Sequence, residues 1–408
     1  MFELGIRTAC VFLRVVYFFM KLAPTRKKVT FISRMGNVAS PDFRLLQAEM
    51  QSALPDYRFV TKCQRVSGTF ESLVRYAPMV FSQMLHIATS KLVILDSYCI
   101  PVSVLKHKRS LKVVQIWHAI GLMKKAGYAA LGAEEGRSEE LAMLLSMHRG
   151  YTHILVNSPA CETAILQVFG YVEDSPSRHG HAHKEVLVGA LPRVDRVQDG
   201  AAKAKMRARI YKTHPSLKGK KVILYAPTSR KNMAPLFEKV EQLVEAVRQA
   251  NRRGANFALV VRLHPGNRKY WEGPFEGLDE EEAENIDVQD DDVLFNAKFS
   301  TAEMGMVADA CISDYSSLIY EFMIMRKPVY FFAFDLEEYE KARGIFIDYR
   351  KEVPGTVHDD AEDLVQAIVN SECALKKQQA FLKKYVSYSA GRNSQTLAEG
   401  IVRIVADG

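Results

Sequence analysis

Beyond Lys28 the chain alternates short apolar runs with longer amphipathic stretches. Near-continuous apolar runs of this length are typical of strands that are buried on both faces of a sheet. Helical spacing of apolar residues lies between several of the runs, as in Phe43–Leu54 and Pro159–Phe169. The strands predicted in the first half are Val29–Ser33, Arg58–Lys62, Leu92–Asp96, Lys112–Ile116, His153–Asn157 and Glu185–Val188.

A second series of the same kind follows a polar, lysine-rich segment at about Asp199 to Lys221. Its predicted strands are Val222–Ala226, Phe257–Leu263, Ala310–Ser313 and Val329–Ala333, with helices that include Pro235–Asn251 and Ser316–Met325. Strands that alternate with helices indicate parallel sheets covered on both faces. The pattern therefore predicts an α/β protein with two doubly wound, Rossmann-like domains in tandem, residues 28–205 and 206–408.

The N-terminal segment, residues 1–27, predicts an amphipathic helix. Arg14 interrupts its apolar run, so the clean stretch is far shorter than the ~20 residues that span a bilayer. Arg7, Arg14 and Lys21 fall seven apart and share one face of a helix. Pro24 ends the helix, and a basic cluster follows it. We expect this helix to lie on an anionic membrane surface, at its cytoplasmic face; the alternative is a first helix packed on the protein's own core.

Composition narrows the choice of partners. The net charge is +8, which suits an anionic partner such as nucleic acid, acidic lipid or a phosphorylated substrate. The basic residues are spread along the chain and the aromatic residues of Val329–Phe334 belong to a predicted buried strand, so nucleic acid is disfavoured. The six cysteines show no CxxC spacing, which is typical of reduced thiols in a cytoplasmic protein.

Two polar segments could in principle bind metal. The acidic run Leu278–Asp292 is more simply a solvated loop and helix. The histidine-rich run Arg178–His183 has no carboxylate or cysteine partner at the usual spacing. Neither predicts a metal site, and the sequence holds no P-loop, G-x-S-x-G or H-E-x-x-H pattern.

Candidate chemistry lies at the predicted strand ends, because ligands of open parallel sheets bind outside the carboxyl ends of the strands. The fourth strand ends at Trp117 and His118, with Lys124 and Lys125 close behind. In the second series, a strand ends in "VVRLHP", where Arg262 and Leu263 precede His264. Each histidine alone is more simply structural. If the two domains face each other, one imidazole could act as a general base and the other could stabilise phosphate charge.

The segment "ISDYSSLIYEF" places two serines at the start of an apolar helix. Ser316 and Ser317 with the free N–H groups of a helix start could bind a diphosphate, while Glu321 could accept hydrogen bonds from a ribose. The alternative is an ordinary N-cap with a surface glutamate.

Taken together, these segments resemble the CDP-glycerol glycerophosphotransferase family, the teichoic-acid polyol-phosphate primases and polymerases. The resemblance rests on ordered blocks: "QIWHAIGLMKKAGY", "VGALPRVD", "ILYAPTSR", "VRLHP", "ISDYSSLIYEF", "KPVYFFAFDLEEYEKARGIFIDY" and "EVPG". It implies a GT-B fold and transfer of a polyol phosphate to a lipid-linked saccharide acceptor at the cytoplasmic membrane face. It also implies that the second domain binds the CDP donor and the first the acceptor, and the last helix could pack back on the first domain.

The resemblance assigns roles to individual residues. His118 and His264 match the catalytic histidines, and Lys124 and Lys125 are candidates for steering a phosphorylated acceptor. The implied donor-binding residues are Trp117, Ala119, Ile120, Gly121, Arg193, Pro227, Thr228, Arg262, Leu263, Ser316, Ser317 and Glu321. Two blocks depart from the commoner pattern: Ala119-Ile120-Gly121 stands for Gly-Thr-Pro, and "GALPRVD" is one residue longer than G-x-P-R-x-D.

The implied donor is CDP-glycerol and the implied leaving group is CMP, with no required cofactor, although Mg²⁺ could travel with the diphosphate. The alternatives are CDP-ribitol as the donor, or a GT-B glycosyltransferase that uses a nucleotide-sugar. Glycerol against ribitol, and primase against polymerase, stay open at this point.

Overall fold

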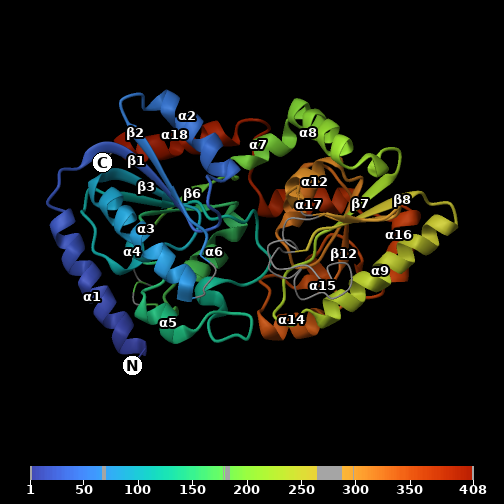
Figure 1. Cartoon of the computed structure of the whole chain (residues 1–408), viewed down its shortest axis with the longest axis horizontal. Coiled ribbons are helices and arrows are strands. Elements are labelled where there is room, and N and C mark those ends of the chain that lie inside the picture. Colours follow the sequence, from blue (N-terminus) through green and yellow to red (C-terminus); the bar gives the residue numbers. More distant parts are fainter. Residues whose placement is uncertain are drawn as a thin grey trace. The chain divides into compact units, whose positions relative to one another are not determined.

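The structure is a computed structural model, and it describes residues 2–66, 70–177, 179, 184–263, 287–296 and 298–406 (Figure 1). The chain divides into two compact units. Unit 1 comprises residues 1–120, 125–195 and 385–408, and unit 2 comprises residues 121–124 and 196–384. The polar stretch that marks the predicted break contains helix α8 (Gly200–Thr213), which belongs to unit 2.

Unit 1 is built on a six-stranded sheet in the order β2-β1-β3-β4-β5-β6, and all of its pairings are parallel. The strands are β1 (Arg26–Ser33), β2 (Arg58–Cys63), β3 (Ser90–Leu95), β4 (Lys112–Gln115), β5 (His153–Val156) and β6 (Glu185–Val188). Every strand predicted in this half overlaps an observed one. The predicted α/β class with parallel strands is confirmed.

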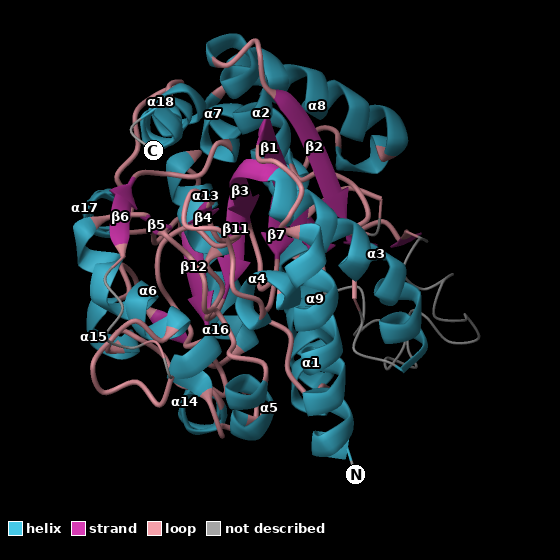
Figure 2. Cartoon of the chain, turned by 90° about the vertical axis from the view of Figure 1, so that its left-hand side faces the viewer, coloured by secondary structure: helices cyan, strands magenta, loops and turns pink. Residues whose placement is uncertain are grey.

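Helices cover both faces of this sheet (Figures 1 and 2). Right-handed crossovers place the helix after β1 on one face and the helix after β2 on the other, because the chain reverses its direction across the sheet between them. On the first face, α2 packs against the last helix, α18. The helices are α1 (Phe2–Met20), α2 (Pro41–Ala53), α3 (Phe70–Thr89), α4 (Ile100–Val104), α5 (Glu139–Leu144), α6 (Glu162–Phe169), α7 (Arg193–Gln198) and α18 (Asn393–Ala406).

A carboxylate from the "PRVD" block anchors α18 to unit 1. Asp195 accepts hydrogen bonds from the backbone N–H groups of Asn393 and Ser394 at 2.9 and 2.8 Å, and from the Ser394 hydroxyl at 2.6 Å. Burial raises the pKa of Asp195, but these hydrogen bonds outweigh it and lower the pKa below its usual value. The ionised carboxylate therefore caps the helix and also meets the positive end of its dipole.

Unit 2 holds a seven-stranded sheet in the order β13-β12-β11-β7-β8-β10-β9, in which only the β9–β10 pairing is antiparallel. The sequence pattern does not predict β9, β10 or β13, which are two or three residues long. The strands are β7 (Lys221–Tyr225), β8 (Phe257–Val261), β9 (Val288–Gln289), β10 (Val293–Phe295), β11 (Ala310–Ser313), β12 (Val329–Phe332) and β13 (Val357–His358).

Apolar helix faces cover the sheet of unit 2. Helix α9, for example, buries one side rich in leucine and valine and packs against α16. Besides α8, the helices among the described residues of this unit are α9 (Ala234–Arg252), α12 (Thr301–Val307), α13 (Leu318–Ile324), α14 (Leu336–Ala342), α15 (Tyr349–Glu352), α16 (Ala361–Val369) and α17 (Leu375–Tyr385).

Each sheet has one point where the strand order reverses. In unit 1 it lies between β1 and β3, because the chain runs outward from β1 to β2 and then returns to the other side of β1. In unit 2 it lies between β7 and β11, for the same reason. The loops that leave such neighbouring strands diverge to opposite faces, which opens a crevice at the carboxyl edge where ligands of these folds bind.

Helix α1 packs on unit 1 at Cys10 and Tyr17, which are buried, and hydrogen bonds from neighbouring polar residues add to this contact. Arg14 donates to the Val104 carbonyl, Lys21 donates to the Lys106 carbonyl, and the buried Tyr17 hydroxyl bonds His107 Nδ1 at 2.8 Å. The two carbonyls lie at the end of α4 and in the loop that follows it. Two of the three basic residues that share one face of the helix, Arg14 and Lys21, therefore bond to unit 1, whereas Arg7 pairs with Glu3 of the same helix.

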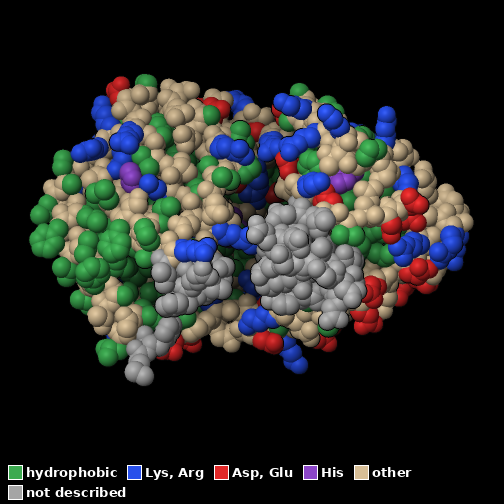
Figure 3. All heavy atoms as spheres, viewed as in Figure 1, with side chains coloured by type: hydrophobic (Ala, Val, Ile, Leu, Met, Phe, Trp, Pro, Cys, Tyr) green, Lys and Arg blue, Asp and Glu red, His purple; other side chains and the backbone are tan. Residues whose placement is uncertain are grey.

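The opposite side of α1 presents large apolar side chains to the surface. We call it the α1 apolar face and define it by Leu4, Val11, Phe12, Val15, Phe18, Phe19 and Leu22, with Phe81 and Leu85 of α3 beside it. Figure 3 shows apolar side chains gathered over this part of unit 1. Phe12 and Phe81 meet edge to face, at 6.3 Å between ring centroids, so the two helices form one continuous surface. Among the described residues no helix is both long and apolar enough to cross a bilayer.

The segment Gly121–Lys124 leaves unit 1 and packs within unit 2. The Leu122 carbonyl accepts a hydrogen bond from the Tyr320 hydroxyl at 2.7 Å, and the Met123 carbonyl accepts one from the Phe346 N–H at 2.8 Å. Gly121 has a φ of +66°, and a Cβ there would stand 2.3 Å from the Tyr320 ring. Only glycine fits, because both the backbone conformation and the space exclude a side chain.

This packing gives a stability prediction with a matched control. Gly121→Ala should lower the free energy of unfolding by roughly 2–4 kcal/mol, from the left-handed backbone plus the forced displacement of Tyr320. Gly132→Ala, at φ +71° with open space around it, should cost only the backbone share of about 1 kcal/mol. Chemical denaturation of both variants checks this. Equal losses would mean that the contact with Tyr320 contributes nothing.

Candidate active site

Trp117 and His118 form a tight turn directly after β4. Trp117 has a φ of +59°, a conformation that is strained for a bulky residue and is concentrated at functional sites. Its backbone N–H donates to the buried Gln115 side chain at 2.9 Å, and its ring packs on the His118 ring, with centroids 4.2 Å apart, and on Phe169. The turn holds both rings in fixed places at the carboxyl edge of the sheet.

A backbone carbonyl sets the tautomer of His118. His118 Nδ1 lies 3.1 Å from the carbonyl oxygen of Asp96, at the end of the neighbouring strand β3. A carbonyl oxygen only accepts hydrogen bonds, so Nδ1 carries the proton and the lone pair of the neutral ring lies on Nε2. This is the arrangement that a general base needs.

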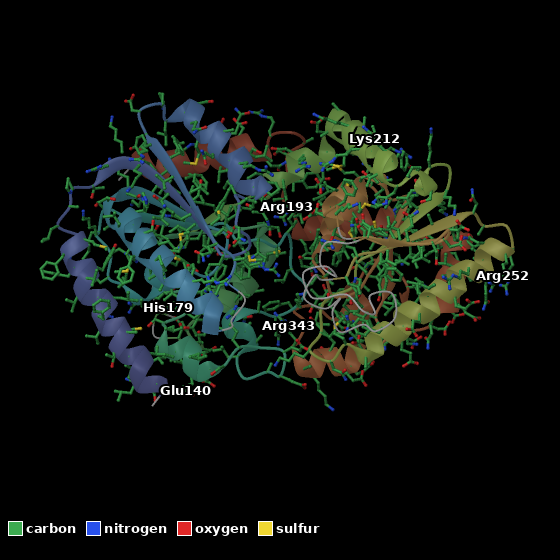
Figure 4. All side chains as sticks on the ribbon, viewed as in Figure 1. Glu140, His179, Arg193, Lys212, Arg252 and Arg343 are labelled. Atoms are coloured by element: carbon green, nitrogen blue, oxygen red, sulfur yellow. The ribbon has the colours of Figure 1, made fainter. Side chains whose placement is uncertain are left out.

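Arg193, labelled in Figure 4, fixes the backbone on the other side of His118. Its guanidinium donates to the His118 carbonyl at 2.9 Å and to the Asp42 carboxylate at 2.5 Å, and its backbone N–H donates to the same carboxylate at 2.7 Å. Asp42 is buried at the start of α2, so the ion pair is shielded from water. The resemblance implies that Arg193 contacts the donor; in the structure its guanidinium bonds to Asp42 and to the histidine turn, and its contact with the donor stays a prediction.

The other predicted site residues in the segment that follows His118 differ in how deeply they are buried. Ala119 is half-buried, whereas the side chain of Ile120 is buried in unit 1. Lys124 and Lys125 are half-buried, and Lys124 forms an antiparallel bridge with Ile345 within unit 2. Their predicted contacts with a ligand stay predictions.

Asp96, which sequence reasoning missed, lies at the centre of the carboxyl edge of unit 1. Burial raises the pKa of its carboxyl group to about 6, against the opposing effect of hydrogen bonds from Ser33 and Ser97. The neighbouring carboxylate of Asp42 adds to the rise. A carboxyl group of this kind carries a proton for much of the time just below neutral pH, directly beside the carbonyl that holds His118.

In unit 2, the two loops at the switch point are joined by one buried carboxylate. Asp314, after β11, accepts from the Thr228 N–H at 3.0 Å and from the Thr228 hydroxyl at 2.7 Å, after β7. The Tyr349 hydroxyl donates to the Asp314 carbonyl at 3.0 Å. Thr228 was predicted to bind the donor; in the structure it is buried and its hydroxyl holds Asp314, while Pro227 beside it is half-buried.

Arg230 completes this buried cluster. Its guanidinium pairs with Asp314 at 2.9 Å and with Asp335 at 2.5 Å, and it lies over the rings of Tyr315 and Tyr339. Burial alone would lower the pKa of Arg230, but the two carboxylates raise it above its usual value. The cluster fixes the loops after β7 and β11 against each other, so the backbone next to Ser316 is held in place.

The predicted anion-binding serines lie at the start of the short helix α13. Ser317 is the N-cap residue, but its side chain makes no capping hydrogen bond; the Ser316 hydroxyl accepts from the Leu318 N–H at 3.3 Å instead. Both serines are half-buried, and Glu321, one turn later, is buried rather than on the surface. The surface glutamate of the alternative interpretation is therefore wrong.

Arg262 follows β8 at the same edge of the sheet, and its guanidinium donates to the Asn296 carbonyl at 3.1 Å. Burial lowers the pKa of Arg262, with Asp287 opposing the change. Leu263 is buried. His264 lies outside the described residues, as do most of the two candidate metal segments, residues 178–183 and 278–292.

The residues that sequence reasoning missed are buried carboxylates and their cations. Their partners lie far away along the chain, so no spacing pattern in the sequence reveals these contacts. The residues are Asp42, Asp96, Arg230 and Asp335. The one available signal was Asp96, which ends an apolar strand just as His118 does.

Comparison with known proteins identifies the class of enzyme that these features define. The sequence profile of the CDP-glycerol:poly(glycerophosphate) glycerophosphotransferases matches residues 15–403. The chain therefore belongs to this family of teichoic acid polyol-phosphate transferases, which confirms the resemblance seen in the sequence.

Two relatives and one solved structure illustrate the membership. The chain is 26% identical over 389 residues to the teichoic acid ribitol-phosphate primase of Bacillus spizizenii, covering 93% of this chain and 92% of the primase. It is 24% identical to the teichoic acid glycerol-phosphate primase of Bacillus subtilis, covering 97% of each. The wall teichoic acid polymerase TagF shares its fold, with a TM-score of 0.69, 17% identity and coverage of 99% of this chain and 98% of that one.

The raised pKa of Asp96 gives a prediction for pH. A carboxyl group whose pKa is higher in the folded state than in the unfolded state stabilises the fold below pH 4, and this contribution is lost as the pH rises through about 6. Asp96→Asn cannot ionise, so the loss of stability between pH 4 and pH 7 should shrink by on the order of 2 kcal/mol. Urea denaturation of both proteins at several pH values checks this; parallel stability curves would contradict it.

Proposed function

We propose that the protein transfers glycerol phosphate from CDP-glycerol to a hydroxyl group of a lipid-linked acceptor and releases CMP. Family membership supports the reaction class, and the ordered turn at His118 is the observation that carries the mechanism. Ribitol phosphate from CDP-ribitol is the second candidate, because the relatives include a ribitol-phosphate primase as well as a glycerol-phosphate primase.

In the proposed step, the acceptor hydroxyl oxygen forms a bond to the phosphorus atom that carries the polyol. The bond from that phosphorus to the bridging oxygen breaks in line with the attack, and CMP leaves with the electron pair. His118 Nε2 takes the hydroxyl proton, and the hydrogen bond from Nδ1 to the Asp96 carbonyl keeps the ring oriented. The Asp42–Arg193 pair fixes the backbone of the same turn, so positioning supplies much of the rate, as phosphoryl transfer requires.

We assign the donor to the carboxyl edge of unit 2. Ser316, Ser317 and Glu321 are proposed to contact the diphosphate and ribose, with Arg262 on the phosphate, and the Asp314–Arg230 cluster holds the loops that carry the serines. His264 is proposed to stabilise developing phosphate charge. No step of this scheme calls for an essential metal; a Mg²⁺ ion that accompanies the diphosphate is the alternative, and activity in the presence of a chelator distinguishes the two.

Replacement of His118 tests the mechanism. His118→Ala should lower kcat for CMP release by roughly 10²–10⁴-fold, because it removes the general base. The melting temperature and the Kd for the CDP-polyol should change little, since the proposed donor contacts lie on unit 2. Turnover of His118→Ala within a few fold of wild type would exclude this assignment.

A donor panel tests the substrate class. With a lipid-linked acceptor, CDP-glycerol and CDP-ribitol are compared with UDP-sugars, and the released nucleotide is measured by chromatography. We expect CMP from one CDP-polyol. Release of UDP from a UDP-sugar would overturn the donor class, and preference for CDP-ribitol would select the second candidate.

We further propose that the α1 apolar face rests on an anionic bilayer, which would bring the enzyme to its lipid-linked substrate. Side chains such as Phe19 and Leu22 are 63% and 73% exposed, which is costly unless something covers them. Lys106 and Arg109 are exposed beside the end of α1, because Lys21 and Lys108 bond this loop to it, and they suit acidic lipid headgroups.

Removal of two phenylalanines tests this surface. The double variant Phe18→Ser, Phe19→Ser should partition at least roughly tenfold less onto vesicles that contain phosphatidylglycerol, because burial of each ring is worth about 1.5–3 kcal/mol. Leu375→Ser, on an exposed position of α17, serves as the control and should sediment with vesicles as wild type does. Undiminished binding of the double variant would refute the proposal.

A further inference from the structure

Arg34 lies at the switch point of unit 1 and has no role in the scheme above. It is the first residue after β1, and the neighbouring strand β3 ends just before Asp96 and Ser97. The Arg34 backbone N–H donates to the Ser97 hydroxyl at 3.0 Å, which ties the two loops together. Arg34 therefore stands where open parallel sheets bind their ligands.

The guanidinium of Arg34 is held between aromatic rings rather than by carboxylates. Its Cζ lies 5.5 Å from the centroid of the Tyr76 ring and 5.8 Å from that of the Tyr98 ring. Within the described part of the chain, its buried Nε has no hydrogen-bond partner, and no carboxylate pairs with it. Arg193 and Arg230, which also lie at the carboxyl edges of the two sheets, both have carboxylate partners.

A guanidinium with an unpaired buried N–H group and no carboxylate partner among the described residues is suited to bind an anionic ligand. Leaving a buried donor unsatisfied costs about 1–3 kcal/mol, more for a charged group, so such a donor calls for a partner. The two rings restrict the orientation of the planar fork, which favours an ordered contact with phosphate oxygens. A phosphate would provide both the acceptor atoms and the opposite charge.

The sheet register relates Arg34 to His118. Ile32 of β1 lies level with Leu95 of β3, which lies level with Gln115 of β4. Arg34 and His118 therefore leave the sheet two strands apart, about 10 Å between their backbones, and they bond to the Asp96–Ser97 step from opposite sides. One or two polyol phosphate units of an acceptor can bridge this distance.

We propose that Arg34 binds a phosphate group of the acceptor, on the polyol phosphate unit next to the hydroxyl that His118 deprotonates. This inference rests on the proposed function and specifies its acceptor: a chain end that already carries a phosphodiester. We assign the donor diphosphate to unit 2 and not to Arg34, and a raised KM for the CDP-polyol on replacement of Arg34 would contradict this assignment.

The test compares two acceptors with wild type, Arg34→Gln and Arg34→Lys. One acceptor is a lipid that ends in glycerol phosphate, and the other is its uncharged methyl phosphotriester. Arg34→Gln should raise KM for the anionic acceptor roughly 10–100-fold, the equivalent of losing a charge-assisted hydrogen bond. KM for the CDP-polyol and KM for the uncharged acceptor should stay within about twofold. Arg34→Lys keeps the positive charge but loses the planar fork, so its KM for the anionic acceptor should lie between those of wild type and Arg34→Gln.

Arg44→Gln is the matched control, because it removes one positive charge from an exposed position of α2 and should leave every constant unchanged. An unchanged KM for the anionic acceptor in Arg34→Gln would overturn the proposal, and so would a raised KM for the CDP-polyol. Equal losses with both acceptors, together with a lower Tm, would assign Arg34 a structural role instead.

The phosphate site at Arg34 can be tested even if the proposed reaction is wrong. If wild type releases no CMP from any CDP-polyol, the proposed reaction fails, but calorimetric titration of the anionic lipid in short-chain form still decides the inference. Binding by wild type and Arg44→Gln that Arg34→Gln lacks would support a phosphate site at Arg34. Equal binding by all three proteins would overturn it.

Discussion

Parallel pairing of β1, β3 and β4 is the constraint on which the chemistry of unit 1 depends. Because parallel neighbours end at the same edge, the loops that follow them are level, and residues far apart in sequence meet there. The Asp96–Ser97 step occupies the middle position. Its carbonyl fixes the His118 ring, and its serine hydroxyl fixes the backbone of Arg34. A slip of one residue in either pairing would turn these groups to the other face of the sheet.

Buried ion pairs fix the loops at the carboxyl edge of the sheet in both units. In unit 1 the Asp42–Arg193 pair fixes the turn at His118, and in unit 2 Arg230 joins Asp314 to Asp335 around the switch point. Buried pairs of this kind add little net stability, because desolvation offsets most of the attraction. Their main effect is on geometry. A loop conformation that separates the pair would leave an unpaired charge in the interior, so only conformations that keep the pair together are stable. The guanidinium of Arg34 differs from those of Arg193 and Arg230, since it lies beside the rings of Tyr76 and Tyr98 and no carboxylate among the described residues pairs with it.

Much of this fold could be predicted from the sequence, because strands buried on both faces must be apolar throughout. Every predicted strand overlaps an observed one, whereas β9, β10 and β13 are too short to leave a pattern. The position of His118 could also be predicted, because a polar residue directly after an apolar run marks the end of a buried strand. The partners of Arg193 and Thr228 could not, because they depend on which loops the topology brings together. The side of α1 that packs on the protein could not be predicted either, because apolar residues lie around most of the helix and several sides could be buried.

The Ala119-Ile120-Gly121 block shows how packing sets the course of the chain after His118. Gly121 needs a φ of +66° and lies against the Tyr320 ring, whereas proline is restricted to a φ near −65°. A chain that reads Gly-Thr-Pro at these positions must therefore follow a different path after its histidine. Ile120 is buried, so its side chain adds to the interior and cannot replace a polar ligand contact of threonine. The structural difference between the two forms therefore lies in the backbone path that follows His118.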